Sequence, residues 1–184
     1  MNERFEIRLA GTGGQGMILA GIILAEAVAS QPEKRVVQTQ SYGPEARGGA
    51  SKSEVIIANA EIDYPKVIEA DLLLALSQEA CDKYGHNLKP EGWIIVDSSQ
   101  VKRIPPHPKT IRVPITQIAE EKTGRKITAN VVSLGLIVGL TEIVPREALV
   151  EAIAQWAPKG THEINHRAVE AGFAEAARLR GRPS

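Results

Sequence analysis

The apolar positions of the chain follow two rhythms. Over the first two thirds, short apolar runs alternate with longer stretches whose apolar residues share one face of a helix. That alternation is typical of β-α-β units, so it predicts an α/β fold with a mainly parallel sheet flanked by helices, Rossmann-like in organisation. The runs place strands at 5–10, 35–40, 53–58, 71–76 and 93–96, with a further edge strand at 110–113.

Helices are predicted between the strands and through the C-terminal third. An apolar-rich stretch at 14–29 follows the first strand, and a shorter one at 78–88 follows Ser77, a suitable N-cap residue. After Ile115 the period becomes helical, which predicts a helical C-terminal third. Its helices are expected at 129–143, 145–156 and 163–180. No repeat or break in composition divides the chain, so we expect a single domain over 1–184.

The composition limits the partners and the chemistry. The 184 residues carry 22 basic and 22 acidic side chains, so the net charge favours neither nucleic acid nor an anionic membrane as a partner. The only cysteine, Cys81, cannot supply the thiolates that an iron–sulfur cluster requires, and in a helix it is typical of a small buried residue. The N-terminal residues mix charges and no apolar run is long enough to span a bilayer, so we expect a cytoplasmic protein.

The first candidate site is the glycine loop, Gly11-Thr12-Gly13-Gly14-Gln15-Gly16, between a predicted strand and a predicted helix. Glycines allow a tight turn there, and backbone amides at the start of the helix favour a phosphate or another anion. The loop fits the G-x-G-x-x-G pattern, but the second strand ends at Gln40 without the acidic residue that holds a ribose. NAD is therefore disfavoured, and glycines kept only for close packing of strand against helix remain an equal alternative.

The second candidate site follows the second predicted strand, at the carboxyl edge where open α/β sheets bind ligands. The segment 41–51 reads Ser-Tyr-Gly-Pro-Glu-Ala-Arg-Gly-Gly-Ala-Ser, and its glycines and proline predict sharp turns. It offers an aromatic ring, an acceptor and a planar cation, which together suit recognition. The alternative is a solvated turn in which the acid and the cation pair only with each other. The residues concerned are Tyr42, Gly43, Glu45, Arg47 and Gly48.

Four motifs in this order resemble one known family. The glycine loop and the segment 41–51 are joined by two later strings, Asn130-Val131-Val132-Ser133-Leu134-Gly135 and Asn165-His166-Arg167-Ala168, the second continuing to Gly172. Together they are similar to the gamma subunits of 2-oxoacid:ferredoxin oxidoreductases, and the likeness runs from about residue 5 to residue 175. The segment 41–51 is nearer to the 2-oxoglutarate type than to the pyruvate type, although the motifs leave the 2-oxoacid itself open.

The resemblance implies an accessory subunit that is not active alone and holds no cofactor by itself. The family's complexes cleave 2-oxoacids with coenzyme A, using thiamine diphosphate, magnesium and iron–sulfur clusters to form an acyl-CoA, carbon dioxide and reduced ferredoxin. The implied partners are alpha and beta subunits, with a ferredoxin-like delta subunit as a further candidate; a homodimer is a candidate state of the isolated chain. No catalytic residue and no metal ligand are expected here, only assembly and a contribution to the coenzyme A site. The candidate cofactor-binding residues are Gly11, Gly13, Gly14, Gln15, Gly16, Tyr42, Gly43, Glu45, Arg47, Gly48 and Asn130.

Two other functions remain as alternatives. His162-Glu163-Ile164-Asn165-His166 fits H-E-x-x-H, in which two histidines one helical turn apart bind zinc and the glutamate activates water. A stand-alone zinc hydrolase also needs a third ligand, but few residues follow His166, and Val169 stands where the extended motif requires glycine. The other alternative is a free nucleotide-binding module built on the glycine loop.

Asp97 is a further polar residue at the end of a predicted strand. Ser98 and Ser99 follow it, so its carboxylate can either cap the next turn or line the cleft at the sheet edge. Capping is the favoured role.

Overall fold

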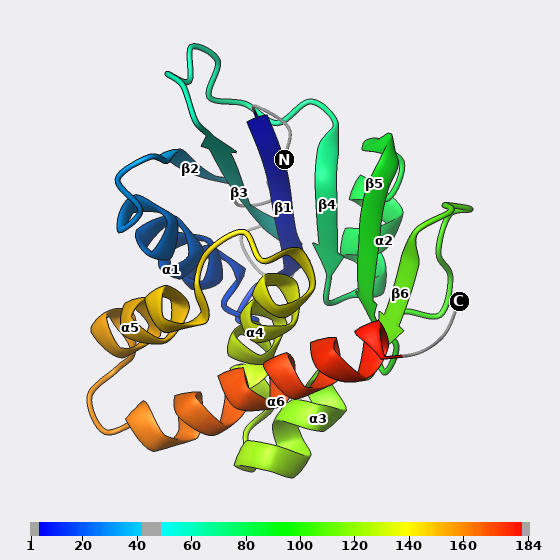
Figure 1. The fold of residues 1–184 in the computed structure, drawn as a ribbon. Coiled ribbons are helices and arrows are strands. Elements are labelled where there is room, and N and C mark those ends of the chain that lie inside the picture. The colour runs from blue at the N-terminus through cyan, green and yellow to red at the C-terminus, as the bar shows by residue number, and fades with distance from the viewer. Residues whose placement is uncertain (1–3, 42–48, 182–184) are drawn as a thin grey trace.

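A six-stranded sheet forms the centre of the molecule (Figure 1). The computed structural model describes residues 4–41 and 49–181. Within them the strands are β1 (Arg4–Thr12), β2 (Arg35–Ser41), β3 (Ala50–Ala58), β4 (Ala70–Ala75), β5 (Leu88–Asp97) and β6 (Thr110–Val113). They lie side by side in the order β2-β3-β1-β4-β5-β6.

The sheet is mainly parallel, as predicted, with one exception. β3 runs antiparallel to both of its neighbours, β1 and β2, whereas β1, β4, β5 and β6 are parallel to one another. β2 therefore points the same way as β1, although β3 lies between them. The predicted β-α-β rhythm fails at this point, because the segment 42–49 that separates β2 from its antiparallel partner is too short for a parallel crossover.

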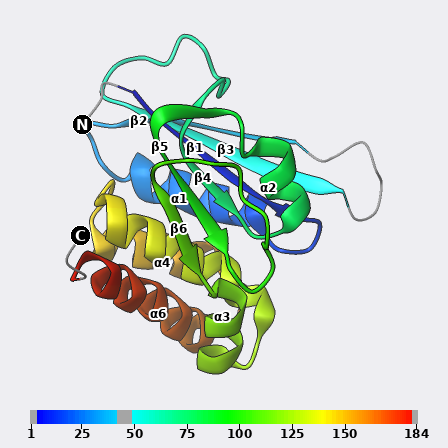
Figure 2. The same ribbon diagram turned by 90° about the vertical axis from the view of Figure 1, so that its right-hand side faces the viewer.

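The helices lie on both faces of the sheet (Figure 2). α1 (Met17–Ala29) and α4 (Ala129–Thr141) lie on one face. α5 (Arg146–Trp156) packs on α1, and α6 (His162–Arg180) packs on α4. α2 (Gln78–Tyr84) covers the opposite face. The molecule is thus layered, and the predicted helical C-terminal third forms most of the layer beside α1.

Burial along the strands follows the alternation of side chains between the two faces of a sheet. Ile7 and Leu9 of β1 point towards α1 and α4 and are fully buried in the larger apolar core. Ala10 points to the other face and belongs to the smaller core around α2. The larger core therefore joins the sheet to the helices that carry the C-terminal third.

The starts of two helices depend on the residue that precedes them. Ser77 caps α2 as predicted, because its hydroxyl oxygen accepts a hydrogen bond from the amide of Ala80 at 3.2 Å. α1 begins at Met17, later than predicted, because Gly16 before it takes a left-handed φ angle of 73°.

Two differences from the predicted elements have a common cause, a weak local pattern. β5 begins earlier than predicted, since it includes Pro90 and Gly92, which usually mark turns. α3 (Ile115–Thr123), followed by the short 3-10 helix η1 (Lys126–Thr128), was not predicted as a helix. Few of the α3 side chains are buried, so its apolar period is too faint to identify.

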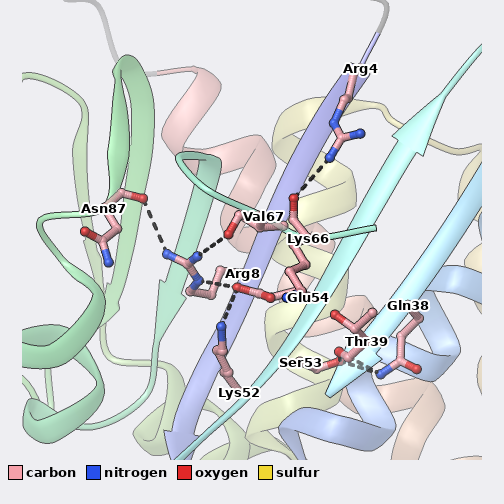
Figure 3. A network of polar contacts seen from close by, with 10 residues as sticks. All are labelled: Arg4, Arg8, Gln38, Thr39, Lys52, Ser53, Glu54, Lys66, Val67 and Asn87. Atoms are coloured by element: carbon pink, nitrogen blue, oxygen red, sulfur yellow. Dashed lines mark hydrogen bonds and ion pairs between the residues drawn. The ribbon is translucent and has the colours of Figure 1, made fainter. Parts of the chain in front are cut away.

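A buried group of charged side chains holds two connections against the α2 face of the sheet (Figure 3). Arg8 of β1 is 3% exposed, and its guanidinium pairs with Glu54 of β3 at 2.7 Å. Arg8 also donates to the carbonyl oxygens of Val67, at 3.2 Å, and Asn87, at 3.4 Å. Lys52 reaches the same Glu54 oxygen at 2.8 Å. Because these charges are paired, the connections that precede β4 and β5 are fixed without an unpaired buried charge.

α4 and α6 approach so closely that their backbones touch. A Cβ atom added to Gly172 of α6 would overlap the carbonyl oxygen of Val132 in α4, and one added to Gly135 would overlap that of Val169. A side chain at either glycine would force the helices apart. Both glycines belong to the strings that resemble the two later family motifs, so these motifs mark the crossing of α4 and α6.

Gly172→Ala should lower the free energy of unfolding by about 1–3 kcal/mol, because the added methyl group overpacks the crossing. The loss should appear although alanine is the better helix former by about 1 kcal/mol. Urea denaturation followed by circular dichroism measures it. Gly13→Ala is the matched control, since a Cβ atom there meets nothing within 4 Å. Equal stability of the two variants would contradict a tight crossing.

Candidate functional site

The glycine loop lies at the carboxyl edge of the parallel strands (Figure 1). The chain leaves β1 at Thr12 and enters α1 at Met17, beside the end of the parallel strand β4. Open α/β sheets bind ligands at this edge. The structure therefore places the predicted anion site where the fold can use it.

The start of α1 presents backbone donors for which the described part of the chain offers no acceptor. Gly14 and Gly16 take left-handed φ angles of 89° and 73°, which glycine adopts at little cost. Gly16 is the N-cap of α1, no side chain caps the helix, and its first turn contains no acidic residue. Within the described residues, no hydrogen-bond acceptor is found for the amides of Gly13 and Gly14. These amides and the positive end of the helix together suit an anion.

The side chain of Gln15 holds the glycine loop in shape. Its Oε1 atom accepts a hydrogen bond from the amide of Thr12 at 2.7 Å. Its Nε2 atom donates to the carbonyl oxygen of Leu76, at the end of β4, at 3.1 Å. A Cβ atom on Gly11 would overlap Oε1, so a side chain there would displace the amide of Gln15. Gln15 and Gly11 thus determine the geometry of the loop.

Asn130, at the start of α4, packs against the end of the glycine loop. Its side chain is largely buried, and its Oδ1 atom accepts a hydrogen bond from the amide of Val131 at 2.8 Å. Its Nδ2 atom lies 3.5 Å from the carbonyl oxygen of Gly16, at the limit of a hydrogen bond. A Cβ atom on Gly16 would lie 2.5 Å from the same Nδ2 atom. Asn130 therefore packs against the loop, at a distance that only glycine at position 16 allows.

A cavity of about 410 Å³, called here the loop cavity, opens beside the glycine loop. It has polar side chains on several walls and one apolar wall. Its lining residues are Gly14, Gln15, Gln100, Thr116, Lys126, Ile127 and Ala129. A slightly larger hollow of about 490 Å³ lies elsewhere, between the end of α1 and the connection of α4 to α5. Of these two hollows, the loop cavity is the one lined by residues of the glycine loop.

Five of the seven lining residues were not predicted as site residues: the polar Gln100, Thr116 and Lys126, and the apolar Ile127 and Ala129. Thr116 lies in α3, the helix that was not predicted. Gln100 and Thr116 come shortly after the carboxyl ends of β5 and β6, so their position after a strand was the available signal. Lys126 had no such signal, because its place depends on how α3 connects to α4.

Asp97 caps two backbone segments at the carboxyl edge of the sheet and is not among the residues that line the loop cavity. Its side chain is fully buried. One carboxylate oxygen accepts a hydrogen bond from the amide of Ser99 at 3.0 Å, and the other accepts one from the amide of Thr116 at 3.0 Å. The favoured prediction of a capping role is confirmed. By joining the turn after β5 to the start of α3, Asp97 fixes one wall of the cavity.

The second candidate site lies mostly outside the described residues, but the strands that flank it are placed. Ala50 of β3 pairs with Thr12 of β1, and Ser51 pairs with Gly11. β3 therefore begins beside the strand that leads into the glycine loop. Since β2 points the same way as β1, the segment that joins β2 to β3 starts from this edge of the sheet. Tyr42, Gly43, Glu45, Arg47 and Gly48 are the predicted site residues that lie outside the described ranges.

The H-E-x-x-H string lies on α6, and no third ligand is placed beside it by the described residues. His162 and His166 are exposed. Glu170, one turn further along the helix, forms an ion pair with Arg146. Within the described parts of the chain, no group of three or more histidine, cysteine, aspartate or glutamate side chains is placed to hold a metal. Asn165 inside the string has a structural partner, since its Nδ2 atom donates to the hydroxyl of Thr161 at 2.9 Å.

Cys81 lies in α2, and its side chain is not suited to act as a nucleophile. It is fully buried in the smaller core. Burial raises the pKa of its thiol, and the neighbouring charge of Asp82 raises it further. A thiol with a raised pKa stays protonated near neutral pH and is unreactive.

An open α/β domain with a glycine loop at the carboxyl edge of its parallel strands belongs to the class of Rossmann-like α/β domains. Within this class, residues 6–175 match the family described as pyruvate ferredoxin/flavodoxin oxidoreductase, and the chain belongs to this family. The predicted resemblance to 2-oxoacid oxidoreductases is confirmed. The match favours it over a zinc hydrolase or a free nucleotide-binding module.

Individual relatives are similar along nearly the whole chain. The 2-oxoglutarate synthase subunit KorC of Methanocaldococcus jannaschii is 50% identical over 179 residues, which cover 96% of each chain. The keto/oxoacid ferredoxin oxidoreductase gamma subunit from Geobacter sulfurreducens has a solved structure with a TM-score of 0.86 and 47% identity, covering 95% of this chain and 97% of that one. The 2-oxoglutarate:ferredoxin oxidoreductase from Magnetococcus marinus, solved with 2-oxoglutarate, coenzyme A and succinyl-CoA bound, shares the fold at a TM-score of 0.85 and 22% identity. There, 97% of this chain matches 32% of a longer chain.

Gln15→Leu should lower the free energy of unfolding by about 1–3 kcal/mol, because the amide of Thr12 and the carbonyl of Leu76 both lose their partner. The amide hydrogen of Thr12 should also exchange faster with solvent, which hydrogen exchange followed by NMR measures. Gln155→Leu, at an exposed position of α5, is the matched control. Unchanged exchange at Thr12 in Gln15→Leu would mean that the loop keeps its shape without this side chain.

Proposed function

We propose that this chain is the gamma subunit of a 2-oxoglutarate:ferredoxin oxidoreductase and contributes to the formation of succinyl-CoA only within the complex. The observation that carries the proposal is the identity to a 2-oxoglutarate synthase subunit, 50% over 96% of the chain. A relative that matches from end to end supports the same place in an assembly as well as the same fold. The 2-oxoglutarate specificity follows from the same identity.

The oxidative chemistry belongs to other subunits. In the complex, thiamine diphosphate with magnesium supplies the cleavage of the 2-oxoacid, and iron–sulfur clusters carry the electrons to ferredoxin. The residues of this chain do not fit an iron–sulfur cluster, because its one cysteine, Cys81, is fully buried in α2. The sequence also contains no glycine-aspartate-glycine string of the kind that holds thiamine diphosphate through a metal. Alpha and beta subunits, with a ferredoxin-like delta subunit as a further candidate, would hold these groups.

The residues of the glycine loop do fit part of coenzyme A. Coenzyme A carries phosphate groups, and the amides of Gly13 and Gly14, at the start of α1, have no acceptor among the described residues. The loop cavity beside them has room for part of such a ligand. In this arrangement Gly13 and Gly14 contact a phosphate, whereas Gln15 and Asn130 act by holding the loop in place. A side chain at Gly11 would displace the side-chain amide of Gln15, and one at Gly16 would displace that of Asn130.

The segment between β2 and β3 completes the proposed site. Its predicted contributors are a cation, Arg47, and the polar or glycine residues around it. β3 begins beside β1, and β2 ends at the same edge of the sheet, which supports a common site with the glycine loop. A guanidinium can form two parallel hydrogen bonds to one phosphate, so Arg47 is the residue best suited to strengthen a weak backbone site.

Two finer features of the proposal rest on the sequence. A cytoplasmic location and a homodimer of the isolated chain remain predictions. The described helices include none that is long and apolar enough to cross a bilayer.

The purified chain alone should show no 2-oxoglutarate-dependent reduction of a viologen dye, because it lacks the groups that cleave the substrate and carry electrons. Co-expression with the alpha and beta subunits, and with delta where it is encoded, should restore the activity. An anaerobic spectrophotometric assay of both preparations measures this. Robust turnover by the lone chain would contradict the proposed accessory role.

Arg47→Ala should raise the Michaelis constant for coenzyme A in the reconstituted complex by about tenfold to a hundredfold, because a charge-assisted hydrogen bond of roughly 1.5–3 kcal/mol is lost. Steady-state assays at varied coenzyme A measure it. Arg178→Ala is the matched control, since among the described residues the side chain of Arg178 on α6 pairs only with Glu175 of its own helix. If Arg47 instead anchors the interface, co-purification with the partner subunits should fall. A complex unchanged in both respects would show that this segment is only a turn.

A further inference from the structure

The turn formed by residues 124–128, between α3 and α4, separates two hollows. On one side lies the loop cavity of about 410 Å³. On the other lies an apolar groove of about 180 Å³, lined among others by Leu19 and Ile23 of α1 and Val131 of α4. Ile127, in the turn itself, lines both hollows and is 51% exposed. The turn is thus the common wall of the two hollows.

Threonine hydroxyls fix the backbone of the 124–128 turn. Thr128 is 5% exposed, and its hydroxyl donates to the carbonyl oxygen of Arg125 at 2.8 Å. The hydroxyl oxygens of Thr123 and Thr128 lie 2.8 Å apart, and that of Thr123 donates to the carbonyl of Ala119 at 2.7 Å. The side chains at 125–127 are exposed on this fixed backbone. A recognition element built in this way loses little conformational entropy when a ligand binds.

The turn presents one cationic side chain to each hollow. Among the described residues, neither of the two cations forms a strong ion pair or hydrogen bond. Lys126 lines the loop cavity, and its Nζ atom lies 3.6 Å from a carboxylate oxygen of Glu120. Both of these side chains are more than half exposed, so the pair is weak. Arg125 lines the groove, and among the described residues its guanidinium has no hydrogen-bond or ion-pair partner. Gln100 lines the loop cavity, and its side-chain amide likewise lacks a partner within the described ranges.

We propose that the 124–128 turn is a second recognition element of the ligand site, in which Lys126 contacts a phosphate of the ligand and Ile127 packs against its less polar part. The ligand class is a phosphorylated nucleotide-type cofactor. A compact ammonium group suits a phosphate because it acts as a point charge. An exposed isoleucine beside it favours binding because a less polar part of the ligand would remove its apolar surface from water. The inference rests on the proposed function, which makes the ligand coenzyme A, and it adds residues that no motif singled out.

The test uses the reconstituted complex with Lys126→Gln, which removes the charge and keeps most of the side chain. The Michaelis constant for coenzyme A and its equilibrium dissociation constant, measured without 2-oxoacid, should both rise about tenfold or more. The turnover number should change less than twofold. Lys126→Arg should recover most of the affinity. Lys122→Gln, at an exposed position one turn earlier on α3, is the matched control and should bind as the unaltered complex does.

Dephospho-coenzyme A identifies the phosphate that Lys126 contacts. If Lys126→Gln and the unaltered complex bind this analogue equally, Lys126 contacts the 3′-phosphate; if the variant remains weaker, it contacts the diphosphate. Either result supports the proposal, provided that Lys126→Gln weakens the binding of coenzyme A itself.

Three results would overturn the proposal. Unchanged coenzyme A binding in Lys126→Gln, together with weaker binding in Arg47→Ala, would remove the 124–128 turn from the site and leave the proposed function intact. Unchanged binding in both variants of an assembled complex would count against the coenzyme A role of the whole chain. Reduced co-purification of Lys126→Gln, with normal coenzyme A affinity once assembled, would make the turn a contact to a partner subunit.

Discussion

The backbone contact between α4 and α6 is the constraint on which the candidate site depends. Gly135 and Gly172 let the two helices touch, so the position of α4 is fixed by the much longer α6. The first turn of α4 carries Asn130, which lies against the carbonyl oxygen of Gly16 in the glycine loop. The same turn follows directly on residues 124–128. A displacement of α4 would therefore move the support of the loop and one wall of its cavity together.

Much of the fold could be predicted because its signals are local. The alternation of apolar residues identifies the strands, and Ser77 marks the start of α2 through its own hydroxyl. The glycine loop could also be recognised, because Gly14 and Gly16 need left-handed backbone angles that other residues adopt at a cost. In each of these cases the residue type determines the geometry of its own neighbourhood, so the sequence is sufficient.

The rest depends on which distant segments meet, which residue types alone do not tell. β3 between β1 and β2, the faint helix α3 and the cavity position of Lys126 all follow from tertiary packing. Gln15 and Asn130 show the same limit for the site. An amide side chain in a motif can bind a ligand as well as it can hold a loop in place. Here both polar atoms of the Gln15 amide form hydrogen bonds inside the protein, with Thr12 and Leu76. Sequence could indicate that these residues matter, but only their partners show that they position the loop.

The hydrogen bonds of Gln15 have a consequence for the speed of ligand exchange. A loop that closes only around its ligand must order itself at each encounter and reopen before the ligand leaves. The glycine loop is instead tied to β1 and β4 from within, with its outward amides already in place. Any ligand that it contacts can therefore arrive and depart without waiting for this loop to refold. Such a site suits a molecule that is exchanged in every turnover, as opposed to one that is retained.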